Sequence, residues 1–284
     1  MSEQGYLSLL RNVLEDGEDR IDRTKIGTRS VFGPQLNFDL ALDGFPLLTT
    51  KRLPFKQILA ENLWFISGAT DTSFLKEQNV RIWDGNTSRA FLDQRGLTDY
   101  QEGEVGPLYG YQWRHFGGDF RDASKGGVDQ LQRMLDLLRT EPTSRRIFMS
   151  AWNPKDLDKM VLEPCHVSFQ LYVSHGFHLD GKVYLRSNDL FLGAPWNIAG
   201  YALLLEMFAH LSGYTPGRLI YSVGDAHIYH THKTAVETQL ERMTKCFPRL
   251  VFTRKHERWE DFDMSSVVLE GYDPHPPIKA EMAI

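Results

Sequence analysis

The sequence lacks several features that mark special classes of protein. Its 284 residues include only two cysteines, Cys165 and Cys246, which provide neither a disulfide framework nor a four-ligand zinc pattern. No stretch reaches the roughly 18 apolar residues that a membrane span requires. The N-terminus also has no basic segment followed by an apolar one, as a secretory signal has. We therefore expect a soluble protein of a reducing compartment, the cytoplasm.

The chain also lacks a surplus of basic residues and any clear boundary between domains. The net charge of −5 argues against a wide nucleic-acid-binding surface, although a few local arginines can still hold a small phosphate. The chain has no repeat, no low-complexity run and no Gly/Ser/Pro linker, and 42% of its residues are hydrophobic. This composition predicts one catalytic domain spanning residues 1–284.

The apolar residues follow two periods. Helical spacing predicts helices over residues 54–66, from residue 128 to a stop at Pro142, and over residues 196–211. The last of these is apolar on nearly every side and should be buried. Strict alternation predicts paired strands over residues 166–173 and 182–187, with Val167 and Phe169 on one face and His166 and Ser168 on the other. These elements indicate an α+β fold in which a sheet is backed by a buried helix.

Cys165 is the first candidate for chemistry, because it directly precedes the first alternating strand. A lone cysteine is usually a small buried hydrophobe, and spacing alone leaves that interpretation open. Three features favour a reactive thiolate: Pro164 fixes the backbone, one face of the strand is polar, and Arg186 lies on the expected partner strand. A neighbouring cation lowers the pKa of a thiol and so increases the fraction of thiolate.

Arginines provide a second signal, at Arg23, in the SRR of residues 144–146 and in the RSND of residues 186–189. Consecutive arginines usually belong to a solvated surface. Guanidinium groups beside serines are, however, also preferred ligands of a phosphomonoester. Three such sites in an acidic protein favour an anion-binding pocket.

Two polar residues lie in otherwise apolar helices. Glu61 is surrounded in sequence by Leu59, Leu63 and Trp64, and it is either at the polar edge of its helix or in a site where burial raises the pKa of its carboxyl. Asn197, near the start of the buried helix, is either a structural cap or a reader of a ligand edge.

The segment GDAHIYHTH at residues 224–232 could suggest a metal site, because it holds three histidines. It lacks the carboxylate or thiolate spacing typical of zinc, so we expect no bound metal. His227 and Tyr229 are two residues apart on a probable strand, where both would face one side and could hold a sugar hydroxyl. The apolar C-terminal tail should either pack in the core or close over a ligand.

A series of longer motifs resembles the thymidylate synthase family, of the type with the long insert seen in animal enzymes. The matching stretches are FPLLTTKR at 45–52, VRIWD at 80–84, GPLYGYQWRHFG at 106–117, SRR at 144–146, PCH at 164–166, RSND at 186–189, FLGAPWNIAGYALL at 191–204, GDAHIYHTH at 224–232 and GYDPHPPIK at 271–279. They cover nearly the whole chain from about residue 20. The resemblance implies a large mixed sheet backed by helices around a buried central helix, with dimerisation through the sheet.

The resemblance also implies a role for each matching residue. The implied catalytic residues are Cys165 as nucleophile towards C6 of dUMP, with Glu61, Tyr109, His166 and Asn197. The implied substrate-binding residues are Arg23, Arg145, Arg146, Arg186, Ser187, Asn188, Asp189, Asn197, His227 and Tyr229, with Arg145 and Arg146 supplied by the other subunit of a homodimer. The implied folate-facing residues are Trp83, Asp189 and Ala283.

The implied reaction is the reductive methylation of dUMP to dTMP, with 5,10-methylenetetrahydrofolate as co-substrate and without a metal. Thiolate addition at C6 of uracil would make C5 nucleophilic. Hydrogen bonds would stabilise the charge that develops on O4, and water must be excluded until hydride transfer.

Several positions beside the site depart from the family's pattern. Lys25 replaces a glycine, Glu163 a small or apolar residue, Leu185 a glutamine, Trp196 a phenylalanine and Gly200 a serine. These departures keep a second function open, a hydroxymethylase of the same superfamily in which water replaces hydride and 5-hydroxymethyl-dUMP is the product.

Other residues favour one or another of these functions. Asn197 favours a uracil acceptor, because cytosine-acting relatives tend to carry Asp there, while Trp83 and the terminal Ile284 favour methylation. A third possibility is a non-catalytic nucleotide- or RNA-binding paralogue, which the negative charge and the intact Cys165 disfavour.

Overall fold

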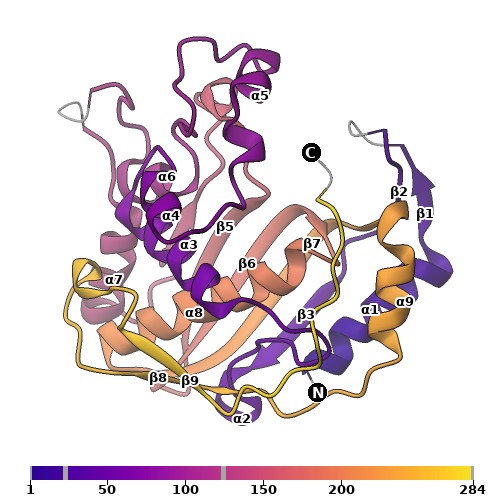
Figure 1. Ribbon diagram of the computed structural model, residues 1–284. Helices are drawn as coiled ribbons and strands as arrows, with labels where there is room; N and C mark the ends of the chain where they lie inside the picture. The colour runs from indigo at the N-terminus through magenta and orange to yellow at the C-terminus, as the bar shows by residue number, and fades with distance from the viewer. Residues whose placement is uncertain (1, 22–24, 123–125, 283–284) are drawn as a thin grey trace.

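The computed structural model describes residues 2–21, 25–122 and 126–282, which form a mixed sheet with helices packed against it (Figure 1). The α-helices are α1 (Ser2–Asp16), α2 (Leu40–Asp43), α3 (Phe55–Ser67), α4 (Ser73–Glu77), α5 (Arg89–Gln94), α6 (Tyr109–His115), α7 (Gln130–Thr140), α8 (Gly193–Ser212) and α9 (Lys233–Leu240). The strands are β1 (Glu18–Arg20), β2 (Thr28–Phe32), β3 (Gln35–Asp39), β4 (Phe148–Ser150), β5 (His166–Ser174), β6 (His178–Asp189), β7 (Thr215–Tyr229), β8 (Arg249–Phe252) and β9 (Val267–Glu270). Short 3-10 helices are η1 (Gly85–Thr87), η2 (Leu157–Lys159), η3 (His230–His232) and η4 (Trp259–Asp261).

The large sheet has the strand order β1-β2-β7-β6-β5-β4, and β3 also pairs with β7. Strands β6 and β7 run parallel, whereas the other pairs are antiparallel. The parallel pair needs a crossover connection, which α8 supplies. The predicted α+β fold with a mixed sheet backed by helices is confirmed.

Helix α8 lies in front of the sheet at the centre of the molecule (Figure 1). Leu203, Leu204, Leu205 and Phe208 have no exposed surface, which confirms the predicted burial of this helix. It contacts β6 and β7 in the sheet, and α3 and α7 among the other helices. A helix covered by neighbours from several directions must be apolar all round, and the sequence pattern reflects this.

The other two predicted helices are also present, with a shifted start for one. Helix α3 follows Pro54, as expected. Helix α7 begins at Gln130 because Asp129 caps it, accepting a hydrogen bond from the backbone N–H of Gln132. Val128, where the prediction began this helix, instead forms a β-bridge with Phe116.

Strand β5 departs from the predicted alternation at its first residues. Its pairing with β6 shifts register between His166 and Ser168, as in a β-bulge. Such a shift re-aims a side chain. His166 is therefore buried, like Phe169 and Leu171, and the prediction that grouped it with the polar face of the strand was wrong.

The face of the sheet opposite α8 carries exposed aromatic side chains. Met149 and Val183 are buried, whereas their neighbours Phe148 on β4 and Tyr184 on β6 are exposed. Tyr172 on β5 is 65% exposed, although it lies beside the buried Leu171. Because side chains alternate between the two faces of a sheet, the exposed set shares one face.

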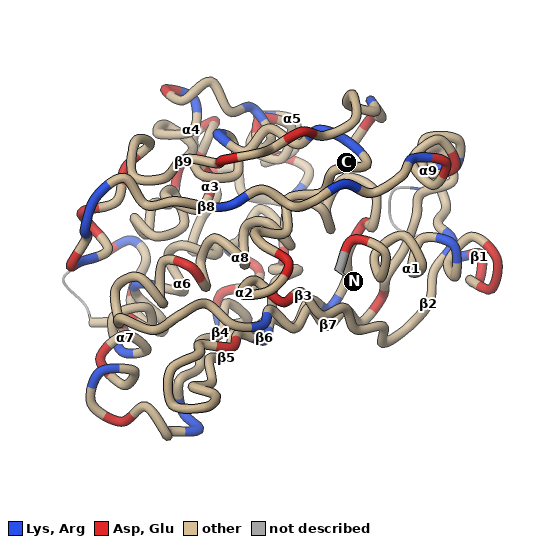
Figure 2. Tube along the Cα trace, turned by 90° about the horizontal axis from the view of Figure 1, so that it is seen from below, with Lys and Arg blue, Asp and Glu red and all other residues tan. Residues whose placement is uncertain are grey.

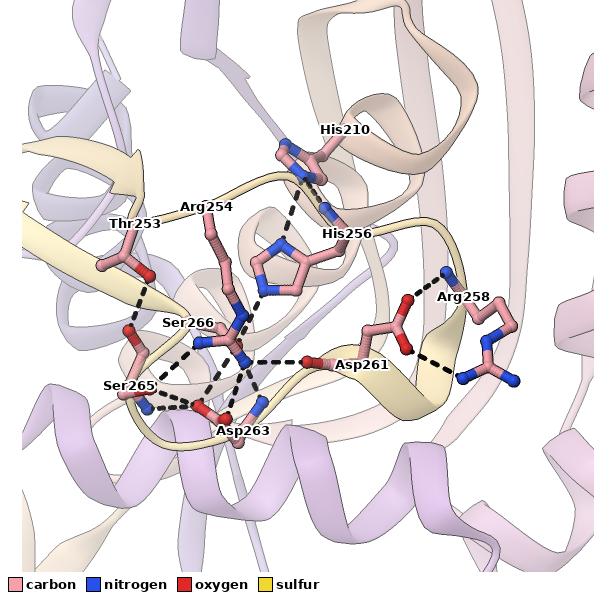
Figure 3. Close-up of polar contacts among 9 residues, drawn as sticks. All are labelled: His210, Thr253, Arg254, His256, Arg258, Asp261, Asp263, Ser265 and Ser266. Atoms are coloured by element: carbon pink, nitrogen blue, oxygen red, sulfur yellow. Dashed lines mark hydrogen bonds and ion pairs between the residues drawn. The ribbon is translucent and has the colours of Figure 1, made fainter.

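A second sheet, the antiparallel pair β8 and β9, lies near the C-terminal end of α8. Residues of the loop between the two strands form a polar cluster with His210 of α8, which we call the hairpin cluster: His210, Arg254, His256, Asp263, Ser265 and Ser266 (Figure 3). The His256 ring lies between the Oγ of Ser266 at 3.0 Å and Nε2 of His210 at 3.2 Å. The cluster therefore ties the hairpin loop to helix α8.

Charged residues of both signs lie side by side around the periphery, for example on α7 and α9 (Figure 2). Within the described part of the chain, no helix is both long and apolar enough to cross a bilayer.

Candidate active site

The candidate site lies where the C-terminal ends of β6 and β7 meet the start of β5. The two parallel strands end at the same edge, with Asp189 paired to His227 in register. Strand β5 runs antiparallel to β6 and begins there, so Cys165 lies beside Arg186, whose backbone N–H donates to the Cys165 carbonyl at 2.9 Å. The topology thus gathers three motifs far apart in the sequence.

Cys165 is held by hydrogen bonds on both sides of its peptide. Cys165 is half-buried and forms no disulfide in the described structure. The Cys165 N–H donates to the hydroxyl of Tyr109, the first residue of α6, at 2.9 Å. Arg186 donates from Nε to the carbonyl of Pro164 at 2.9 Å and from Nη2 to that of Glu163 at 2.8 Å. The predicted neighbour relation of Cys165 and Arg186 is confirmed.

Glu61 lies on α3 with 7% of its surface exposed. Trp83 donates its indole N–H to Oε1 at 2.9 Å, and Trp196 donates to Oε2 at 2.6 Å. Burial raises the pKa of the Glu61 carboxyl to about 7, although the two indole hydrogen bonds act in the opposite direction. Of the two readings of Glu61, the structure supports the buried one.

A cavity of about 10 Å³ lies between α3, α8 and the start of β5. That is room for about one water molecule. It is lined by Glu61, Asn62, Phe65, Trp113, His166, Trp196, Asn197, Gly200, Tyr201 and Leu204. Burial lowers the pKa of His166 to about 4, so its ring is neutral at physiological pH. Nδ1 of His166 has no hydrogen-bond partner among the described residues.

A chain of side-chain hydrogen bonds orients the amide of Asn197 on α8. Tyr221 donates to Oδ1 of Asn188 at 2.6 Å, and Nδ2 of Asn188 donates to Oδ1 of Asn197 at 2.9 Å. Since Oδ1 of Asn197 accepts this bond, its amide orientation is determined. Asn188 is itself buried, so it supports Asn197 from the sheet side.

His227 and Tyr229 lie at the end of β7, and their rings are 5.2 Å apart at a right angle, which confirms that they share a side. Nδ1 of His227 is 2.9 Å from the carboxylate of Asp225, which therefore orients the ring. Asp189, at the end of β6, lies 3.7 Å from His232, whose other ring nitrogen contacts the backbone oxygen of Glu281 at 2.7 Å. The C-terminal segment therefore runs next to this edge of the sheet.

Other residues singled out in the sequence lie elsewhere. Arg145 and Arg146 are exposed in the loop before β4, and Arg146 forms a 3.8 Å ion pair with Glu141. Arg23 and Ala283 lie outside the described residues. Ser187, by contrast, lies at the site, on β6 directly after Arg186.

The departures from the family pattern have distinct surroundings. Lys25 has φ of 61°, a left-handed conformation that favours glycine, so it occupies a position where glycine is free of strain. Leu185 is fully buried and lies opposite His166 in register. A Cβ added at Gly200 would lie 3.2 Å from Nδ2 of Asn62.

Sequence reasoning missed three residues of the site. Trp196 was noted only as a departure, and Asp225 and Tyr201 were not considered. Asp225 could have been found from its position two residues before His227 on the same strand. Nothing in the sequence pattern indicates that Tyr201 belongs to the site, because a tyrosine in an apolar helix is typical of a buried core residue. Among the described residues no group of three His, Cys, Asp or Glu side chains could hold a metal ion.

Several known proteins are similar to this chain over nearly its whole length. A family model described as thymidylate synthase matches residues 4–284. Among curated proteins, the chain is 49% identical over 283 residues to the thymidylate synthase of Homo sapiens, covering 98% of this chain and 90% of that protein. It is 46% identical to the thymidylate synthases of Candida albicans and of Herpesvirus ateles, in both cases over 100% of this chain and 98% of the relative.

Proposed function

The chain belongs to the thymidylate synthase family, and from this we propose that it methylates dUMP to dTMP with 5,10-methylenetetrahydrofolate as co-substrate. One catalytic domain over residues 1–284 carries the reaction. A cytoplasmic location is part of the proposal and is supported by the absence of a disulfide at Cys165 and Cys246 in the described structure.

The placement of Cys165 carries the proposal. Its backbone is held by Tyr109 and Arg186, and it directly precedes His166, which lines the cavity together with Glu61. The thiolate adds to C6 of the uracil ring, which turns C5 into a nucleophile. Asn197, oriented through Asn188, hydrogen-bonds the uracil edge.

Glu61 handles protons in this proposal. With a pKa of about 7, its carboxyl is populated in both protonation states at neutral pH, so it can take up and release a proton. The one-water cavity between Glu61 and His166 provides a path for that proton. His166 stays neutral, so its ring can donate or accept a hydrogen bond without adding a buried charge.

Trp83, which contacts Glu61, and Asp189, at the end of β6, fit a folate. Trp83 is half-buried and packs against Trp64 and Tyr109, which leaves a fixed aromatic surface at the rim of the site. Asp189 offers a partly exposed carboxylate that can accept hydrogen bonds. The folate, when bound, supplies the one-carbon unit and the hydride. Trp83, Asp189 and Ala283 would hold it and exclude water.

The nucleotide is held by the residues at the strand ends. Arg186, Ser187 and Arg23 bind the phosphate, because guanidinium and hydroxyl groups suit a phosphomonoester. Asn188 and Asp189 complete the wall of the pocket, and His227 and Tyr229 hold the deoxyribose hydroxyl. The support is the shared strand edge and the fixed orientation of His227 by Asp225.

A homodimer completes the phosphate site in this proposal. The exposed aromatic face of the sheet, with Phe148, Tyr172 and Tyr184, is a surface that a second copy would bury. Arg145 and Arg146 lie exposed directly before β4 at the sheet's edge, and they would contact the nucleotide bound by the partner subunit.

Subunit mixing tests this arrangement. A Cys165→Ala variant and an Arg145→Ala/Arg146→Ala variant should each be inactive alone. After denaturation and joint refolding, random pairing makes half of the dimers mixed, and one of the two sites in each mixed dimer is intact. About a quarter of wild-type activity should therefore return. If no activity returned although mixed dimers formed, the arginines would act within their own subunit.

The product of the reaction tests the function. Wild-type protein with dUMP and methylenetetrahydrofolate should form dihydrofolate and dTMP. Cys165→Ala should abolish turnover and keep dUMP binding, whereas Cys246→Ala, the same change at an exposed cysteine, should leave turnover unchanged. Tetrahydrofolate together with 5-hydroxymethyl-dUMP would overturn the proposal and establish the hydroxymethylase.

A further inference from the structure

The carboxylate of Glu61 lies between two indole groups that come from different parts of the chain. Trp83 precedes η1 and donates to Oε1, whereas Trp196 belongs to α8 and donates to Oε2. The bond from Trp196 is the shorter of the two, at 2.6 Å against 2.9 Å. Each carboxylate oxygen thus has one indole donor.

We infer that Trp196 is a positioning residue that fixes the Glu61 carboxylate and favours its ionised form during the reaction. This inference rests on the proposed function, because it assigns Trp196 an effect on the proton transfer that Glu61 performs there. Trp196 acts through Glu61.

Hydrogen-bond chemistry gives the direction of the effect. An indole nitrogen can only donate, so it binds an ionised oxygen more strongly than a protonated one. Burial raises the pKa of Glu61, and the indole bonds act against that rise. The titratable groups that line the cavity with Glu61 are His166 from β5 and Tyr201 from α8, and neither supplies a positive charge at neutral pH. The two indoles are therefore the main stabilisation of the buried charge.

A second departure from the family pattern, Gly200, lines the same cavity as Trp196. Gly200 lies one helical turn after Trp196, on the same face of α8, and both line the cavity. A Cβ at Gly200 would come within 3.2 Å of Nδ2 of Asn62, which also lines the cavity. The glycine at 200 therefore leaves space beside Asn62 in the cavity that Trp196 also lines.

Trp196→Phe tests the inference, because it keeps an aromatic ring and removes the donor. At neutral pH, kcat should fall about 10-fold, and KM for dUMP should stay within about twofold. The limb of the kcat–pH profile that depends on Glu61 should move to higher pH, since the loss of a donor raises the pKa of the carboxyl. In a Glu61→Gln background, the same substitution should cause no further loss.

Trp259→Phe is the matched control. Trp259 also packs against α8, through Phe208, and its indole N–H has no hydrogen-bond partner among the described residues. This variant should leave the pH profile in place even if it unfolds at a lower temperature. An equal shift in both variants, or none in Trp196→Phe, would overturn the inference.

A measurement without turnover separates this inference from the proposed function. In ligand-free protein labelled with fluorotryptophan, the fluorine resonance of Trp196 should titrate with a midpoint of about 7, and that of Trp259 should not. A Trp196 signal that stays constant from about pH 5 to pH 9 would refute the inference, whatever the enzyme produces. If the titration is seen but no dTMP forms, the proposed function fails and the Trp196–Glu61 pair stands.

Discussion

The polar group around Glu61 and the hairpin cluster around Asp263 shift the pKa of a carboxyl in opposite directions. Glu61 is buried, and its pKa is raised to about 7 because burial opposes the charge. Asp263 is 55% exposed, and hydrogen bonds from Ser265 and Arg254 hold its pKa well below the usual range (Figure 3). The hairpin cluster pairs its carboxylate with the guanidinium of Arg254, whereas the Glu61 carboxylate receives hydrogen bonds from two neutral indoles.

The same contrast extends to the histidines. In the hairpin cluster, His256 has partners at both ring nitrogens, in Ser266 and His210. In the candidate site, His166 is buried with Nδ1 unsatisfied by the described residues. Unsatisfied buried polar groups cost stability, so they persist where the surrounding fold compensates and where chemistry requires a perturbed proton affinity. The contrast supports the proposed role of the Glu61 group and a structural role for the hairpin cluster.

Glu61→Gln should give the largest effect and sharpen this contrast. Turnover of dUMP should fall at least about 100-fold, because glutamine cannot transfer the proton. Steady-state assays of dihydrofolate formation measure this loss, and circular dichroism checks that the fold is retained. Activity within tenfold of wild type would show that the perturbed carboxyl is not used.

The stability of this variant should depend on pH in a defined direction. The pKa of Glu61 is raised on folding from 4.5 to about 7, so its contribution to stability is fully present below pH 4.5 and is lost as the pH rises through 7. Relative to wild type, Glu61→Gln should therefore gain about 3 kcal/mol in unfolding free energy across that range. Urea denaturation at several pH values measures the difference. A constant difference would contradict a buried, perturbed carboxyl.

Much of this architecture could be predicted from the sequence. The even apolar pattern of α8 predicted its burial, because a helix enclosed by neighbours leaves no polar face. The alternation in β5 and β6 predicted their pairing, and PCH and RSND then placed Cys165 beside Arg186. Local periodicity carries such information directly.

Other features could not be predicted from periodicity. The burial of His166 depends on a register shift in β5, which is a property of two paired strands. The contact of Trp196 with Glu61 joins residues 135 positions apart, and only the packing of α3 against α8 creates it. The hairpin cluster likewise joins His210 to a loop 46 residues later. Non-local contacts of this kind cannot be predicted from local periodicity.

Asp263→Asn should give the smallest effect and tests the structural half of the contrast. The carboxylate accepts bonds from the N–H and Oγ of Ser265 at 2.7 and 2.6 Å, and from Arg254 at 2.7 Å. Replacing it should lower the unfolding free energy by about 1 kcal/mol, since solvent screens a half-exposed charge. Because the pKa is lowered on folding, this loss should be present above pH 3.8 and should disappear as the pH falls below it.

Activity should stay within about twofold of wild type in Asp263→Asn, because the hairpin cluster satisfies its own charge and shares no residue with the candidate site. The matched control is Asp273→Asn, which removes an exposed carboxylate that forms an ion pair with Lys245. It should leave unfolding unchanged in urea titrations, because a single surface ion pair contributes little. If Asp263→Asn lost turnover while it kept the stability of wild type, the hairpin cluster would act on catalysis through α8. The distinction between a catalytic Glu61 group and a structural hairpin cluster would then be wrong.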